Sequence, residues 1–176
     1  MKIFIEVIAD KMEEANEDWQ AFLNKNTGEI VDIGRQYHGI AEELREDEEI
    51  PSHLANWEKE FVQTAIEIAD NWENYVELPN QFDIHEYYSI MEDFVESIAD
   101  HRKSAILYQA MNGRGAFRRF KDKLYDLGLE ESWFAYKYEA YCKIAVRWCD
   151  KYEISYEFKD KRRGLTYANE KRNDTN

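Results

Sequence analysis

One stretch of the chain combines glycines and arginines in a pattern suited to holding an anion: Met-Asn-Gly-Arg-Gly-Ala-Phe-Arg-Arg-Phe-Lys-Asp-Lys-Leu. Gly113 and Gly115 leave backbone N–H groups uncovered where we expect a helix to begin, at Arg114, and a helix N-terminus attracts anions through its free donors and its dipole. Arg118 and Lys121 follow Arg114 at spacings of four and three, which predicts one common helix face. Because a guanidinium can grip a phosphate or a carboxylate with two parallel hydrogen bonds, we interpret these five residues as a candidate site for an anion or an acidic partner.

A purely structural interpretation of the same stretch stays open. Asn112 and Gly113 can simply turn the chain between two helices, and the arginines can pair with carboxylates elsewhere in the protein. The stretch is not a P-loop, because it lacks the Gly-Lys-Ser/Thr ending.

Other reactive residues give little support for catalysis. His85 has no second histidine at the spacing of a helical zinc pair, and the chain has no Cys-x-x-Cys, so we expect no metal and no cofactor. His101 falls in the first turn of an expected helix and is interpreted as a surface or packing residue. Cys142 and Cys149 lie in an apolar helix, which raises a thiol pKa, and a rise of about 10 Å between them is too long for a disulfide. No catalytic residues are assigned, and the sequence leans away from an enzyme.

Charge is distributed unevenly along the 176 residues. The net charge is −14, with 26 Asp and Glu against 6 Lys and Arg in residues 1–100, and 11 against 17 in residues 101–176. Such a net charge opposes non-specific binding to nucleic acid or anionic lipid, while the basic remainder can still hold an anion locally. The simplest interpretation of the acidic part is a solvated surface that keeps the protein soluble.

Composition predicts a folded, cytoplasmic protein. Aromatic residues make up 15% of a chain long enough to bury roughly 70% of its surface on folding. The first residues carry Glu6 and Asp10 where a signal peptide would be apolar, and nothing approaches the ~20 apolar residues of a membrane span. Reduced cysteines are also typical of cytoplasmic proteins.

The first half of the chain mixes helix and strand patterns. We expect a helix over residues 3–15, although its start could also begin a strand, and a β-hairpin from residues 18–23 and 29–33 around a turn that ends at Gly28. Residues 34–49 suggest a short exposed helix or a connector.

A long amphipathic helix is expected next, with Ser52 as its cap. Its apolar stripe would contain Leu54, Trp57, Phe61, Ala65, Ile68 and Trp72. Residues 75–79 then suit a short edge strand that ends at Pro79.

The second half is mainly helical. Asp83 with Glu86 resembles a capping box, Asp100 could cap a helix to about Met111, and a further helix would run from Arg114 to Gly128. Residues 129–150 are apolar on most sides and predict a helix in the middle of the core. An alternating pattern over residues 152–158 predicts a strand that extends the hairpin sheet.

Together these elements predict an α+β fold, mainly α: a helical bundle with a small antiparallel sheet built from the N-terminal hairpin and a C-terminal strand. We expect one domain over residues 1–158 and a disordered polar tail over residues 159–176.

The chain resembles the bacterial group known as uncharacterised protein family 0158. The resemblance rests on Thr27-Gly-Glu-Ile30, on Gly113-Arg-Gly-Ala-Phe-Arg-Arg-Phe-Lys-Asp122, and on Trp133-Phe through Tyr141 to Trp148-Cys149. It spans most of residues 3–158 and says least about residues 34–55. Membership would imply a bacterial or phage cytosolic protein and brings no activity with it.

Three functions are compatible with the sequence. The leading hypothesis is a non-enzymatic binding or regulatory protein in which Arg114 and Arg118 hold an acidic partner protein or a small anionic ligand. The second is an enzyme acting on a nucleotide or phosphoester, with His101 or a carboxylate as acid or base. The third is an acidic decoy that imitates nucleic-acid phosphate.

Overall fold

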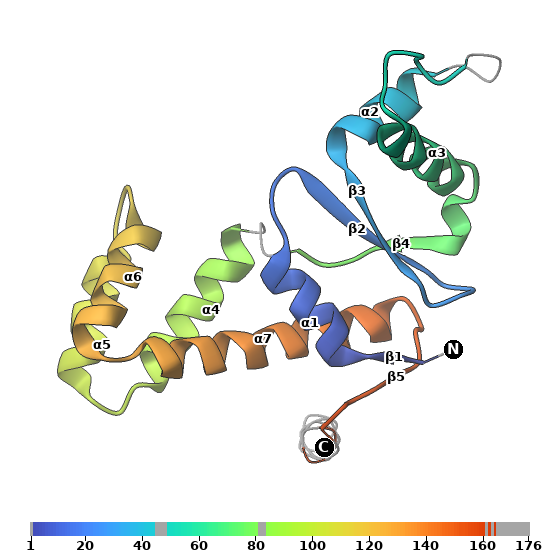
Figure 1. Ribbon diagram of the computed structural model, residues 1–176. Coiled ribbons are helices and arrows are strands. Elements are labelled where there is room, and N and C mark those ends of the chain that lie inside the picture. Colours follow the sequence, from blue (N-terminus) through green and yellow to red (C-terminus); the bar gives the residue numbers. More distant parts are fainter. Residues whose placement is uncertain (1, 45–48, 81–83, 161, 163, 165–176) are drawn as a thin grey trace. The chain divides into compact units, whose positions relative to one another are not determined.

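The computed structural model describes residues 2–44, 49–80, 84–160, 162 and 164. The chain divides into two compact units, and Figure 1 shows their elements. We call Met1–Asn80 with Ala145–Asn176 the sheet unit and Gln81–Ile144 the helical unit. Helices predominate over short strands, so the predicted α+β, mainly α class is confirmed. The single domain over residues 1–158 stays a prediction.

A three-stranded antiparallel sheet organises the sheet unit. Strands β2 (Trp19–Asn24) and β3 (Ile30–Gly34) form the predicted hairpin, and β4 (Tyr75–Glu77) pairs with the other side of β2. The side chain of Asn24 accepts hydrogen bonds from the N–H groups of the turn, and Gly28 closes the turn at φ 82°.

The C-terminal strand does not join this sheet, contrary to the prediction. Strand β5 (Tyr156–Glu157) instead pairs in parallel with β1 (Ile3–Phe4). Alternating residues identify a strand but not its partner, and parallel partners can lie far apart in sequence. The expected tail falls mostly outside the described residues; at its start, the N–H groups of Lys159 and Asp160 donate to the buried carboxylate of Glu6.

Helices α2 (Arg35–Glu43) and α3 (Asn56–Asp70) pack together and against β3. Their common core comprises Phe22, Ile33, Tyr37, Val62, Ala65, Ile68 and Tyr75. Leu23, the neighbour of Phe22 on β2, is also fully buried, so the sheet is covered on both faces.

The predicted start and stripe of the long helix need correction. Helix α3 begins at Asn56, where the Glu58 carboxylate accepts from the Ala55 N–H at 2.8 Å, so Ser52 is not its cap. Trp57 is 57% exposed, and Trp72 lies beyond the helix in a 3₁₀ turn, Trp72–Asn74. The buried stripe is centred on Ala65, with Val62 and Ile68 as its other fully buried members.

Helix α1 (Ile5–Glu14) follows directly from β1, so the N-terminal segment contains both of the predicted alternatives. Ile5, Ile8 and Met12 give α1 a buried stripe. The last residues of α7 (Glu130–Lys151) also belong to this unit, where the Trp148 indole donates to the Glu77 carbonyl at 2.9 Å.

The helical unit contains α4 (Ile84–Ser97), α5 (His101–Ala110), α6 (Ala116–Leu127) and the first part of α7. Trp133 of α7 is buried at its centre, with its ring 5.2 Å from that of Phe94 and 5.1 Å from that of Phe120. The prediction that α7 lies in the core is thus confirmed for this half. The predicted capping residue Asp83 lies outside the described residues.

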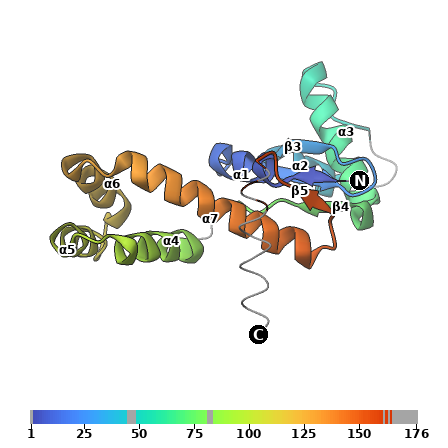
Figure 2. The ribbon, with the colours of Figure 1, turned by 90° about the horizontal axis from the view of Figure 1, so that it is seen from below.

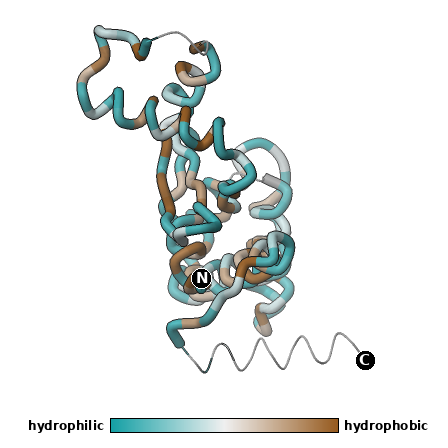
Figure 3. The backbone as a smooth tube through the Cα atoms, turned by 90° about the vertical axis from the view of Figure 1, so that its right-hand side faces the viewer, coloured by the Kyte–Doolittle hydropathy of each residue, from teal (hydrophilic) through white to brown (hydrophobic). Residues whose placement is uncertain are grey.

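Apolar residues come in short runs along the chain, which Figure 3 shows as brown segments interrupted by teal. Within the ranges that the structure describes, no helix has the length and hydropathy needed to cross a membrane.

Candidate functional site

The glycine–arginine stretch forms the turn between α5 and α6. We call residues 101–127 the basic hairpin: two neighbouring helices joined by residues 111–115 (Figure 2). The carboxylate of Asp100 accepts from the N–H groups at the start of α5, as predicted, and Gly128 ends α6 at φ 63°. Gly113 and Gly115 have φ values of 76° and 79°, a left-handed conformation that disfavours any side chain.

Helix α6 begins at Ala116, two residues later than predicted. Arg114 therefore belongs to the turn, because the left-handed Gly115 interrupts helical geometry between Arg114 and the helix. Of the three predicted binding cations, only Arg118 and Lys121 lie on α6, three residues apart; Arg114 does not.

Arg119 holds the turn together, although nothing in the sequence distinguishes it from Arg118. Its Nε donates to the carbonyl of Ala110 at 3.2 Å, and its two terminal nitrogens donate to the carbonyls of Arg114, Asn112 and Gly113. These carbonyls follow the end of α5, where a positive charge is favoured by the helix dipole. The Arg119 side chain is thus the C-terminal cap of α5, supplied by α6.

Lys103 makes the reciprocal contact at the other end of the basic hairpin. Its ammonium donates to the carbonyl of Leu127, the last residue of α6, at 3.0 Å. Each helix thus places a cation at the C-terminus of the other, which fixes their antiparallel alignment.

The three predicted binding cations face solvent. Arg114, Arg118 and Lys121 are exposed, and no described carboxylate lies within 4.0 Å of their charged groups. Residues 101–121 contain six Lys and Arg and no Asp or Glu, in a chain whose net charge is −14. The turn between α5 and α6 is therefore a local concentration of positive charge.

The first N–H groups of α6 add to this positive charge. Gly115 has no side chain with which to cap them, so the N–H groups of Ala116, Phe117 and Arg118 are available donors at the positive end of the helix dipole. Phe117 beside them is 37% exposed, and its ring lies 5.5 Å from that of Tyr87 and 6.5 Å from that of Tyr88. The Tyr88 hydroxyl donates to the Met111 carbonyl at 2.8 Å, which ties α4 to the turn.

His101, the acid–base candidate of the enzyme hypothesis, does not lie at the turn. His101 opens α5, so the ten residues of that helix, about 15 Å, separate it from the turn. Cys142 and Cys149 are buried and form no disulfide, and burial raises the pKa of the Cys149 thiol to about 12, as expected for an apolar helix. Among the described residues no three His, Cys, Asp or Glu side chains are grouped to hold a metal.

Comparison with known families adds a decisive match. The model of the uncharacterised protein family UPF0158 matches residues 53–171, more than half of the chain. The chain belongs to this family. The UPF0158 match includes the basic hairpin and α7, whereas the Thr27–Ile30 turn lies outside it. Neither the curated proteins nor the solved structures contain a significant match.

Proposed function

We propose that this UPF0158 member is a non-enzymatic bacterial cytosolic protein that binds an acidic segment of a partner, or a small anionic ligand, at the turn of its basic hairpin. The observation that carries the proposal is that the cations of the basic hairpin fall into two groups. Arg119 and Lys103 are engaged by backbone carbonyls, whereas Arg114, Arg118 and Lys121 face solvent beside the uncapped N-terminus of α6.

Rigidity of the turn favours binding. Four carbonyls from Ala110 to Arg114 accept hydrogen bonds from the single Arg119 guanidinium, which holds the turn in one conformation. Because the turn is already ordered, binding does not have to order it, and the entropic cost of association is lower. The Arg119 charge also adds to the positive potential near the first N–H groups of α6.

An acidic protein segment fits this surface better than a nucleic acid does. The net charge of −14 repels a long polyanion, while a short acidic segment can approach the turn alone. A cytosolic location agrees with two cysteines that form no disulfide. The distance of His101 from the turn supports binding over phosphoester hydrolysis.

Thermal denaturation with anionic probes tests the proposal. Inorganic phosphate, a nucleoside triphosphate and a hexaglutamate peptide would each be added to the full chain. A probe at a hundred times its dissociation constant should stabilise the fold by about 2.7 kcal/mol. The shift should disappear in Arg114→Ala with Arg118→Ala.

Lys25→Ala with Lys143→Ala is the matched control, because it removes two exposed cations outside the basic hairpin. If the control variant lost the thermal shift to the same extent, the shift would depend on net charge alone and not on the turn. Partner capture from a bacterial lysate extends the test to proteins, with the same two double variants. If no probe shifts the transition and Arg114→Ala with Arg118→Ala captures the same proteins as the wild type, the proposal is wrong.

A further inference from the structure

The three-stranded sheet of the sheet unit has two edge strands, β3 and β4, and their outer edges differ. The edge of β4 is occupied in part, because the indole of Trp148, near the end of α7, donates to the Glu77 carbonyl at 2.9 Å. The edge of β3 has no such contact among the described residues. An unpaired edge of this kind can accept a further strand.

The register of the hairpin identifies the unpaired backbone groups of β3. The Asn24 N–H donates to the Glu29 carbonyl at 2.9 Å, so this pair is hydrogen bonded. Bonded and unbonded pairs alternate along an antiparallel ladder, so every second residue from Glu29 onwards faces β2 with its N–H and C=O. The N–H and C=O groups of Ile30 and Asp32 therefore point outwards, and no described residue binds them.

A hollow of about 390 Å³ runs along this edge. It is lined by Val31–Ile33 of β3, by Phe61 and Thr64 of α3, and by Trp19 of β2. Consecutive residues of a strand point to opposite faces of its sheet, so a hollow that touches three in a row lies against the edge of the strand. The hollow therefore leaves room for side chains of an added strand beside α3.

The α3 side of the hollow is apolar. Ile33 is buried, and the ring of Phe61 lies 5.2 Å from that of Trp19 and 6.2 Å from that of Trp57. Trp19 and Trp57 are 37% and 57% exposed. An apolar side chain that entered the hollow would remove part of this aromatic surface from water.

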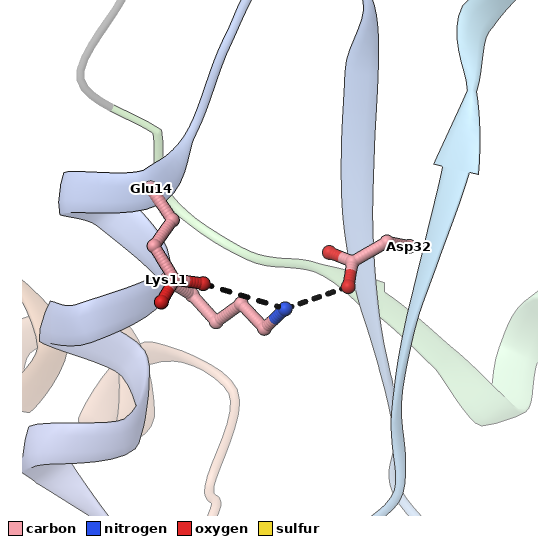
Figure 4. A network of polar contacts seen from close by, with 3 residues as sticks. All are labelled: Lys11, Glu14 and Asp32. Atoms are coloured by element: carbon pink, nitrogen blue, oxygen red, sulfur yellow. Dashed lines mark hydrogen bonds and ion pairs between the residues drawn. The ribbon is translucent and has the colours of Figure 1, made fainter.

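Charge around the β3 edge favours a basic occupant. Residues 1–80 contain 20 Asp and Glu against 6 Lys and Arg, so they account for the whole net charge of −14. Asp32 lies on the edge strand itself (Figure 4). Its Oδ2 is 2.6 Å from Lys11 Nζ, and its Oδ1 has no donor among the described residues. A strand with cations opposite Asp32 would be attracted to this edge.

The same charge disfavours a second copy of this chain on the edge. Two β3 strands paired antiparallel about Asp32 would place their carboxylates opposite each other, which is destabilising. Their acidic surroundings would also repel each other at long range.

We propose that the free edge of β3 binds an extended segment of a partner protein in which Lys or Arg alternates with apolar residues. The segment adds a fourth strand, with main-chain hydrogen bonds to Ile30 and Asp32. Its apolar side chains enter the hollow beside Phe61, and its cations lie on the opposite face beside Asp32. The basic hairpin takes no part in this contact.

Amide hydrogen exchange of the full chain, followed by NMR, tests the proposal. The probe is the peptide acetyl-Lys-Val-Lys-Val-Lys-Val-amide. At saturation it should slow exchange of the Ile30 and Asp32 amides by about tenfold or more, because these N–H groups gain an acceptor. The amides of Val31 and Ile33, which the ladder with β2 already protects, are the internal reference. Unchanged exchange at Ile30 and Asp32 would show that the proposal is wrong.

Two further peptides separate main-chain pairing from charge. A version methylated on its backbone nitrogens keeps the side chains and cations but has no donors, and it should leave both amides unprotected. A version with Glu in place of Lys keeps the donors and should bind about tenfold more weakly or worse. Protection by the methylated peptide, or equal affinity for the Lys and Glu peptides, would contradict the proposal.

A substitution that fills the hollow tests its role. Thr64 donates only to the Glu60 carbonyl of its own helix, so Thr64→Trp removes no contact with β3 and should weaken peptide binding by about tenfold. Gln63→Trp is the matched control, since it adds the same ring at an exposed position of α3. Equal affinities of the two variants would exclude the hollow. If Thr64→Trp does not fold, the methylated peptide still decides the question with the unaltered chain.

Exchange in the absence of peptide tests the alternative occupant. The Ile30 and Asp32 amides should exchange at the same rate in dilute and concentrated protein. Protection that increased with protein concentration would mean that a second copy of the chain occupies the edge, and it would overturn the proposal.

Discussion

The Lys11–Asp32 ion pair of the sheet unit and the basic hairpin of the helical unit use charge in opposite ways. In the sheet unit Lys11 Nζ lies 2.6 Å from Asp32 Oδ2 (Figure 4), and Asp32 Oδ1 has no donor among the described residues. In the basic hairpin Arg119 and Lys103 pair with backbone carbonyls, and unpaired donors remain. Which charges stay free for a ligand depends on which acceptor each side chain meets, and not on how many charges a segment has.

The neighbouring residues Arg118 and Arg119 allow the strongest test of this contrast. Arg119→Ala removes hydrogen bonds from the carbonyls of the turn and should lower the free energy of unfolding by about 1–3 kcal/mol. Arg118→Ala removes an exposed side chain that has no partner among the described residues, and it should change the free energy of unfolding by less than about 0.5 kcal/mol. Urea denaturation of both variants measures the difference. Equal stabilities would mean that Arg119 does not cap α5.

Gly115 of the helical unit and Gly39 of the sheet unit allow a second comparison of the two units. Gly115→Ala must adopt a φ of 79° and also meets the Arg119 side chain at 3.3 Å, so we expect a loss of about 1–2 kcal/mol. Gly39 lies inside α2 with open space around it, so Gly39→Ala should stabilise the protein by about 0.5–1 kcal/mol. Thermal melting should show shifts of opposite sign. A stabilising Gly115→Ala would contradict the described turn.

The Lys11–Asp32 pair should contribute less than either backbone feature. Both side chains are partly exposed, at 29% and 43%, so water screens their attraction. Lys11→Met should therefore cost less than about 1 kcal/mol in chemical denaturation, and added salt should reduce that cost further. A larger, salt-independent loss would contradict this screening by water.

His38 of α2 offers a small, pH-dependent test in the sheet unit. Burial lowers its pKa below the ordinary 6.5, assisted by Arg35, while Glu42 and Glu77 oppose the shift. Its buried Nε2 has no hydrogen-bond partner among the described residues. The unfolded chain therefore takes up this proton at a higher pH than the folded one, so stability should fall as the pH drops below about 6.5.

Denaturation of wild type and His38→Phe at pH 7.5 and pH 5.5 isolates this contribution from that of the carboxylates. We expect a smaller loss of stability in the variant, whose ring can still pack against Phe22. The same loss in both proteins would show that His38 is not responsible.

Several local features could be predicted because they depend on neighbouring residues alone. Asp100 caps α5 through donors two and three residues away, and Gly128 ends α6 because its φ of 63° suits glycine. The hairpin of β2 and β3 follows from its turn residues in the same way. The turn between α5 and α6 was predicted in its position, but the role of Arg119 in it was overlooked.

Predictions were wrong where contacts with a distant segment of the chain determine the structure. Trp57 and Phe61 both fit one helical stripe, yet the sheet covers Phe61 more than Trp57. The alternation at Tyr156 predicted a strand, but only the position of β1 determined its parallel partner. The contact of Lys11 with Asp32 was not predicted, because its partners lie 21 residues apart, on α1 and β3.

The sequence by itself determined the fold class, the local ends of several helices, the membership in UPF0158 and the concentration of cations in residues 101–121. Those properties depend on composition and on interactions within a few residues. Only the tertiary structure decided that Arg119 caps α5 while Arg118 faces solvent, and that Lys11 pairs with Asp32. The roles of charged side chains depend on which groups folding places within about 3 Å of them, and spacing along the chain does not specify those groups.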